Sequence, residues 1–210
     1  MDVRTAEVRR LFDRYLVELV EPYDLCPWAR PARLGGEVSV EVLWGTPSVD
    51  AFTEAARALL ARPTTKVAMV IAPEIDADPL DLREIRSQVT SRLSGIGVAE
   101  FHPDSPLDAT TPARLVPYLR RSPDPLLQLV PLSLLASVRA PPTTADRVLQ
   151  IQMLGGQAAP LRGDVADIIA ADNHARVTAA ADAVAAKIAD IAEDRRRSYA
   201  RVGITIRTGL

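Results

Sequence analysis

Two side chains of this 210-residue chain have the chemistry of a nucleophile and a base, and both residue types are rare in it. Cys26 is the single cysteine. A thiol just before the first turn of a helix can be stabilised as a thiolate by unpaired backbone N–H groups; the alternative is a small, buried, unreactive cysteine. His102 is one of two histidines, and it can move a proton near neutral pH or simply hydrogen-bond at a strand end. The candidate catalytic pair is therefore Cys26 and His102.

A loop with the sequence Arg-Arg-Ser-Pro-Asp-Pro, residues 120–125, presents guanidinium and hydroxyl groups between prolines. Such a loop could hold a carboxylate or a phosphate, and a plain surface turn is the alternative. The candidate ligand-binding residues are two arginines and a serine of this loop, with an aspartate that follows His102 and a tryptophan that follows Cys26: Arg121, Ser122, Arg120, Asp104 and Trp28.

Three short motifs occur in order along the chain. They are Leu-Cys-Pro-Trp-Ala at 25–29, Phe-His-Pro at 101–103 and Arg-Ser-Pro-Asp-Pro at 121–125. In order and approximate spacing they resemble the domain of unknown function 1415 family, an uncharacterised group of bacterial proteins, over about residues 8–157. A histidine that follows the third motif in that family corresponds to Gln128 here. The family has no established reaction, so the resemblance implies only one shared site, made of Cys26, His102, Arg121 and Ser122.

The elements that must position these residues follow from hydrophobic periodicity. Strands are predicted at 38–44, 67–72 and 98–101, with a helix between each pair, which indicates two crossover connections in an α/β sheet. Ligands of such sheets bind beyond the carboxyl ends of the strands. That rule places four polar residues on one rim: Glu74, Asp76, His102 and Asp104.

The expected fold class is α/β, with a three- or four-stranded, mainly parallel or mixed sheet flanked by helices and with a long C-terminal helix. Residues 126–130 are either a fourth strand or a buried turn of helix. An α/β domain is expected over residues 1–157, and a helical extension over 158–210 that packs on it within the same globular unit.

The extension is predicted to contain one helix from residue 164 to about 193, preceded by another at 144–154. Along the long helix, apolar and small residues recur at alternating spacings of four and three, a pattern typical of close helix packing. This seam consists of Ala170, His174, Val177, Ala181, Val184, Ile188 and Ile191. Its partner could be the first helix of the chain or a second subunit. Alternation at Val202, Ile204 and Ile206 predicts an edge strand near the end.

Composition excludes several classes of function. A net charge of −2 gives no general attraction to nucleic acid, and no uncharged apolar run of 18 residues is present for a membrane span. One cysteine forms no internal disulfide, and with two histidines it leaves too few ligands for a structural zinc site. No metal site is therefore expected, although His102, Asp104 and Glu74 form a weak candidate set, and no cofactor is indicated. Since the first residues lack a signal-peptide core, a cytoplasmic protein is the simplest expectation.

Three functions from different classes remain. The favoured one is a small-molecule enzyme for acyl transfer or thiol chemistry, with Cys26 as nucleophile or redox thiol, His102 as base and Arg121 as the anion contact. The second is a non-catalytic module that binds a small anion or a nucleotide through Arg120, Arg121 and Ser122. The third is a structural protein that forms a homodimer through its C-terminal helix.

Overall fold

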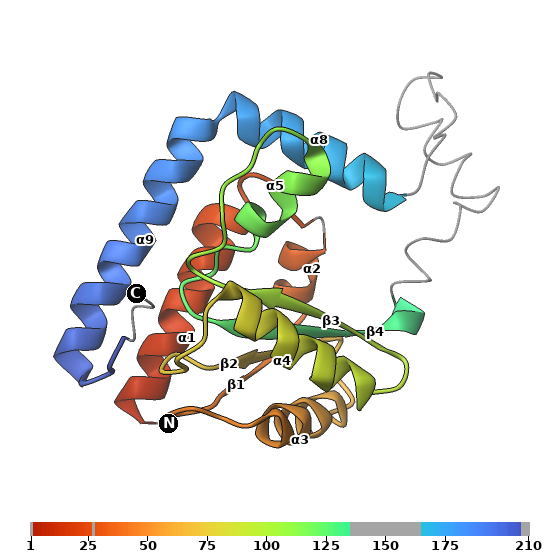
Figure 1. Cartoon of the computed structure of the whole chain (residues 1–210), viewed down its shortest axis with the longest axis vertical. Helices are drawn as coiled ribbons and strands as arrows, with labels where there is room; N and C mark the ends of the chain where they lie inside the picture. Colours follow the sequence, from red (N-terminus) through yellow and green to blue (C-terminus); the bar gives the residue numbers. More distant parts are fainter. Residues whose placement is uncertain (1, 27, 135–164, 207–210) are drawn as a thin grey trace.

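A four-stranded mixed sheet lies at the centre of the fold (Figure 1). The computed structural model describes residues 2–26, 28–134 and 165–206. Its strands are β1 (Val38–Val42), β2 (Val67–Ile71), β3 (Ile96–Phe101) and β4 (Leu126–Pro131). They lie in the order β1-β2-β4-β3; β1 and β2 are parallel, and β4 runs antiparallel to both of its neighbours. The α/β class and the mixed sheet predicted from the sequence are confirmed, and residues 126–131 form the fourth strand.

Helices cover both faces of this sheet. They are α1 (Val3–Tyr15), continued by the π-helical segment η1 (Leu16–Val20), then α2 (Ala29–Leu34), α3 (Val49–Leu60), α4 (Pro79–Ser91), α5 (Pro112–Leu119), α8 (Val165–Ala179) and α9 (Ala181–Val202). Because side chains alternate along a strand, β2 contributes Met69 and Ile71 to the core under α1 and α9, and Ala68 and Val70 to the core under α3 and α4. Both faces of β2 are therefore buried, as its continuous apolar sequence requires.

Two helices begin where their capping residues predict. The side chain of Ser48 accepts a hydrogen bond from the backbone N–H of Ala51 at the start of α3. At the start of α4, Asp78 accepts from two backbone N–H groups, and Pro79 occupies the first helical position, where its missing donor costs nothing. This second cap fixes the end of the loop that follows β2, and that loop lines a cavity.

The single long C-terminal helix predicted from the sequence is wrong. The helix is interrupted at Ala180, whose φ of −120° and ψ of 26° are not helical, so α8 and α9 are separate helices. The predicted edge strand is also wrong, because Val202 still belongs to α9 and Gly203 ends that helix with a φ of 70°, which glycine adopts without strain. Ile204 then turns back into the core, where it is buried. The helix predicted at 144–154 lies outside the described residues.

Three residues of the seam are buried within the chain itself. Val177, Val184 and Ile191 belong to the same core as Val8 and Leu11 of α1. Figure 1 shows α9 beside α1, with α8 continuing over α5. Of the two partners that the sequence left open, the first helix is the one that lies against α9 in this chain.

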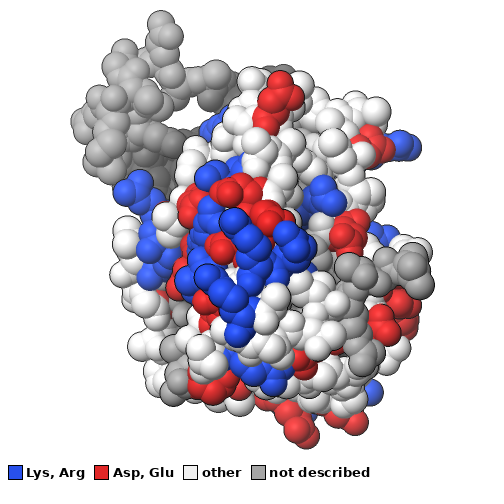
Figure 2. Space-filling view, turned by 90° about the vertical axis from the view of Figure 1, so that its left-hand side faces the viewer, with Lys and Arg blue, Asp and Glu red and all other residues white. Residues whose placement is uncertain are grey.

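Charged side chains line the outer border between α1 and α9 (Figure 2). Asp194 accepts hydrogen bonds from Arg10 at 2.9 Å and Arg14 at 2.8 Å, and Lys187 donates to Glu18 at 3.0 Å. In this view acidic side chains border a group of basic ones, and the cations of the border are paired with neighbouring carboxylates. In the described part of the chain, no helix is long and apolar enough to cross a membrane.

A substitution at Leu127 tests whether β4 lies at the centre of the sheet, because this side chain is fully buried between the sheet and the α3–α4 layer. Leu127→Ala should lower the free energy of unfolding by about 2–5 kcal/mol through lost burial and a residual cavity. Leu80→Ala is the control, since Leu80 is 68% exposed, and it should change stability by about 0.5 kcal/mol or less. Urea unfolding followed by circular dichroism measures both, and equal effects would contradict the placement of Leu127.

Candidate functional site

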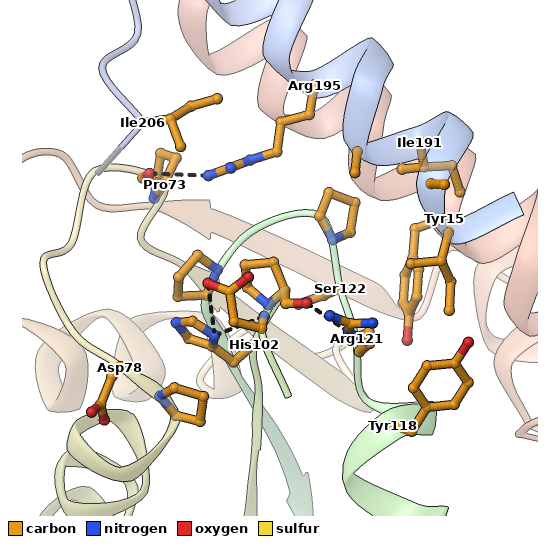
Figure 3. A pocket seen from close by; sticks show the side chains of 18 of the residues that line it. Tyr15, Pro73, Asp78, His102, Tyr118, Arg121, Ser122, Ile191, Arg195 and Ile206 are labelled. Carbon is orange, nitrogen blue, oxygen red and sulfur yellow. Dashed lines mark hydrogen bonds and ion pairs between the residues drawn. The ribbon is translucent and has the colours of Figure 1, made fainter. Parts of the chain in front are cut away.

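A cavity of about 610 Å³ lies at the rim where β2 and β3 end (Figure 3). Because β4 is antiparallel, its first residue, Leu126, pairs with Ile71 and Phe101, the last residues of β2 and β3. The loops after those two strands and the loop before β4 therefore meet at one place. Asp76, His102 and Asp104 line the cavity, as the rule for strand ends predicts.

The walls differ in chemistry. The loop side carries polar groups and several prolines, whereas the opposite wall is an apolar strip of α9 with side chains from α1 and η1. The apolar wall consists of Ala185, Ile188, Ala189, Ile191, Ala192, Tyr15 and Leu19. A ligand in this cavity would thus have a polar side toward the loops and an apolar side toward the helices.

The imidazole of His102 braces the two loops that follow β2 and β3. Its Nε2–H donates to the carbonyl oxygen of Ala77 at 2.9 Å, which leaves Nδ1 to accept from the backbone N–H of Asp104 at 3.0 Å. Both ring nitrogens are therefore engaged with the backbone, and the side chain is almost completely buried. Burial lowers the pKa of His102 and favours the neutral ring, against the opposite influence of the hydrogen bond to Ala77 and of nearby carboxylates. The sequence left two roles open for His102, proton transfer and hydrogen bonding at a strand end. This geometry matches the second.

Arg121 is the cation of the loop side. Its Nε–H donates to the carbonyl oxygen of Pro103 at 2.8 Å, and its guanidinium carbon lies 5.6 Å from the centre of the Tyr118 ring. No ion pair joins Arg121 to an acidic side chain within the described residues. The terminal nitrogens of its guanidinium are thus the donors that this loop can offer to an anion.

A buried ion pair joins the loop before β4 to α9. Asp124 is 2% exposed; one of its carboxylate oxygens accepts from Nε of Arg195 at 2.8 Å, and the other accepts from the hydroxyl of Tyr199 at 2.5 Å. Arg195 lines the cavity and also reaches the carbonyl oxygen of Pro73 at 3.5 Å, as Figure 3 shows. The hydroxyl of Ser122, a predicted ligand contact, donates its hydrogen bond to the backbone carbonyl of Asp124 within the same loop.

Glu74 does not belong to this site, although the sequence places it on the same rim. Its carboxylate is ion-paired with Arg4 and accepts a hydrogen bond from the backbone N–H of Gly45 at 3.1 Å. The weak candidate metal set of His102, Asp104 and Glu74 is therefore not assembled around one point. Among the residues that the structure describes, no group of three or more side chains is arranged to hold a metal ion.

Cys26 and Trp28 do not line the cavity. Cys26 is partly buried and packs against the core that includes Tyr15 and Leu19. Burial raises the pKa of Cys26, and the backbone N–H groups of Trp28 and Ala29 only partly oppose this effect. The thiolate that the sequence suggested is thus disfavoured, and Cys26 is not joined to His102.

Arg120 is turned away from Arg121. It does not line the cavity; its Nη1 lies 3.9 Å from a carboxylate oxygen of Glu100, and its guanidinium carbon lies 5.7 Å from the centre of the Phe101 ring. Of the seven residues predicted from the sequence, the structure brings four to the cavity: His102, Asp104, Arg121 and Ser122.

Sequence reasoning missed Arg195, although a signal for it was present. The seam spacing of four and three runs through Ile188 and Ile191, and its next step of four reaches Arg195. An arginine at a core position of a helix requires a buried acidic partner. Asp124 stands in the proline-rich loop that the sequence had already marked, but the pairing of two sites 71 positions apart depends on the fold.

Replacing Arg195 should destabilise the fold, because the buried carboxylate of Asp124 would lose its cation. Arg195→Met should lower the free energy of unfolding by about 3–5 kcal/mol, because Asp124 stays buried without its cation. Adding Asp124→Asn to that variant should restore more than half of the loss. Arg196→Met, at a side chain that is 69% exposed, is the control and should have little effect. Urea unfolding is the measurement, and equal losses at positions 195 and 196 would contradict the pairing.

The buried His102 should make stability depend on pH. Its pKa in the folded protein is lower than the ordinary value of 6.5, so the unfolded chain binds more protons than the folded one just below pH 6.5. The contribution is complete above pH 6.5 and is lost as the pH falls toward the folded-state value. His102→Asn should flatten this part of the stability profile, measured as the free energy of urea unfolding between about pH 5 and pH 8. Should the profile keep its slope in His102→Asn, another group would be responsible.

Comparisons with protein-family models, with curated proteins and with solved structures found no match for this chain. The chemistry of the cavity is therefore inferred from its own residues. Three properties carry that inference: a cation on the loop side, an apolar wall on the helix side, and a histidine held by two backbone groups.

Proposed function

We propose that the cavity binds a small organic anion that carries an apolar group. Its volume of about 610 Å³ lies within the range of small-molecule sites, roughly 300–1,000 Å³. Arg121 would hold the anionic head and the strip of α9 would contact the apolar part. This is the binding-module function that the sequence placed second, and the position of Arg121 in the cavity is the observation that carries it.

Arg121 suits a carboxylate. The hydrogen bond to Pro103 and the contact with Tyr118 restrict its guanidinium to one orientation, so little freedom is lost when a ligand binds. A guanidinium presents two parallel donors to one carboxylate, and a neighbouring low-polarity wall strengthens that interaction. Arg195 is less suited to the same role, because its charge is already paired with the buried carboxylate of Asp124 and its Nη2 also reaches the carbonyl oxygen of Pro73.

The apolar wall supports an anion with a hydrocarbon portion rather than a bare inorganic ion. Ile188, Ile191 and Leu19 offer carbon surface to the cavity. Burying one methylene group against such surface is worth about 0.8 kcal/mol, which is close to a fourfold gain in affinity. A short-chain or aromatic monocarboxylate combines both features.

The enzyme that the sequence favoured would need Cys26 and His102 to act on one ligand. What weighs against it is that Cys26 lies outside the cavity, with burial raising its pKa, and that both ring nitrogens of His102 are bonded to the backbone. A binding role needs neither a nucleophile nor a base, so it is consistent with both observations.

Calorimetric titration with hexanoate and hexanol tests the proposal. Hexanoate should bind, hexanol should bind much more weakly, and Arg121→Gln should weaken hexanoate at least about tenfold, since a hydrogen bond to a charged group is worth about 1.5–3 kcal/mol. Arg62→Gln is the matched control, because Arg62 is exposed and does not line the cavity. Equal affinity for hexanoate and hexanol, or an unchanged affinity in Arg121→Gln, would overturn the proposal.

A further inference from the structure

A second group of arginines lies outside the cavity, around the carboxylate of Glu100 on β3. Nε of Arg83 lies 3.4 Å from Oε1 of Glu100, Nε of Arg86 lies 3.3 Å from Oε2, and Nη1 of Arg120 lies 3.9 Å from Oε2. Arg83 and Arg86 come from α4, and Arg120 comes from the end of α5. We call these three arginines and Glu100 the Glu100 cluster. Segments from three parts of the chain thus converge on one carboxylate.

The charges of the Glu100 cluster do not balance. Three guanidinium groups and one carboxylate leave a formal charge of +2 within a few ångströms. The cations also repel one another: burial lowers the pKa of Arg120, and the positive charges of Arg86 and Arg83 act in the same direction. A concentration of like charge is unfavourable unless an anion offsets it, and it is typical of sites that bind one.

The guanidinium groups of the Glu100 cluster keep unused donors. Nε of Arg86 is buried and has no hydrogen-bond partner, because its approach to Glu100 lacks hydrogen-bond geometry. Within the described parts of the chain, none of the three guanidinium groups donates a hydrogen bond to a residue other than Glu100. Arg120 is held in place by its contact with Phe101 at 5.7 Å. Of these donors, only Nε of Arg86 is both buried and without a partner, which is costly for a polar group. The other donors are open to an arriving ligand.

The arginines of the Glu100 cluster are more exposed to solvent than the carboxylate that they surround. The side chains of Arg83, Arg86 and Arg120 are 53%, 31% and 36% exposed, whereas that of Glu100 is 18% exposed. An anion arriving from solvent therefore meets guanidinium groups first, with the resident carboxylate behind them.

We propose that Arg83, Arg86 and Arg120 form a binding site for a phosphate monoester, separate from the cavity. A phosphate monoester carries a charge of about −1.5 to −2 at neutral pH and three strong acceptor oxygens, so it matches both the uncompensated charge and the number of guanidinium groups. Arginine is the residue best suited to this geometry, because its planar fork pairs with two phosphate oxygens. A monocarboxylate offers half the charge and would bind less tightly.

This site gives separate roles to two adjacent arginines. Arg121 points into the cavity and Arg120 points to the Glu100 cluster. The phosphate site does not depend on what the cavity binds, and the two proposals can therefore be tested independently with the same protein.

A charge series at the Glu100 cluster tests the proposal in calorimetric titrations at neutral pH and physiological salt. The probe is glycerol 3-phosphate, a phosphate monoester without the apolar group that the cavity is proposed to contact. Arg83→Gln and Arg86→Gln should each weaken binding about tenfold. Glu100→Gln should strengthen it about fivefold, because removal of the repelling carboxylate raises the local charge. A merely structural ion-pair cluster predicts no such gain. Inorganic phosphate and a phosphoserine peptide, titrated in parallel, distinguish a small-molecule ligand from a modified protein segment.

Arg62→Gln is the control and should bind glycerol 3-phosphate as the wild type does, because Arg62 is exposed and lies in neither site. Circular dichroism and the unfolding midpoint verify that each variant is folded, and the exposed Arg83 position keeps the test decisive if Glu100→Gln is unstable. Weaker binding in folded Glu100→Gln, wild-type affinity in Arg83→Gln, or no binding by the wild type would each overturn the proposal. A loss in Arg121→Gln would place the phosphate in the cavity instead.

Discussion

The carboxylate of Asp124 is buried next to β4, and the arrangement of the cavity depends on the guanidinium of Arg195 that reaches it from α9. A charge in such a position costs several kcal/mol unless it is paired and hydrogen-bonded. Asp124 meets both needs, since Arg195 and Tyr199 each donate to one of its oxygens. The pair can form only when α9 lies against this loop. Its geometry therefore sets where the apolar wall of the cavity stands relative to the polar loops.

The direction of β4 has an equally large effect on the site. An antiparallel strand inserted between β2 and β3 starts where its neighbours end, which brings residues 121–125 to the carboxyl rim. A parallel fourth strand would have left Arg121 at the opposite edge, far from His102. The rim thus combines two strand ends with one strand start, and prolines in all three loops restrict the backbone there. A ligand would meet a site whose shape is already set.

Local features were predictable because they depend on nearby residues. The capping groups of Ser48 and Asp78 and the apolar runs of the strands are examples. Strand order, the break at Ala180 and the burial of Arg195 depend on contacts between distant segments, and they were not predicted.

The family resemblance implies one site shared by four residues, and only three of them lie together in this structure. His102, Arg121 and Ser122 line the cavity, whereas Cys26 does not and packs against the core that includes Tyr15. The sequence was enough to predict that His102 follows a strand end. It was not enough to predict that, of the neighbouring Arg120 and Arg121, only Arg121 faces the cavity.

The packing of α1 on α9 sets a delay between synthesis and completion of the core. Arg10 and Asp194, which bond across this border, are 184 positions apart. At about 5–20 residues per second, a ribosome needs about 10–40 s to make the chain between them. During that time the apolar face of α1, with Val8, Leu11 and Phe12, lacks the helix that covers it in the finished protein. A nascent chain of this protein therefore presents a long-lived hydrophobic surface, the kind of segment that chaperones bind.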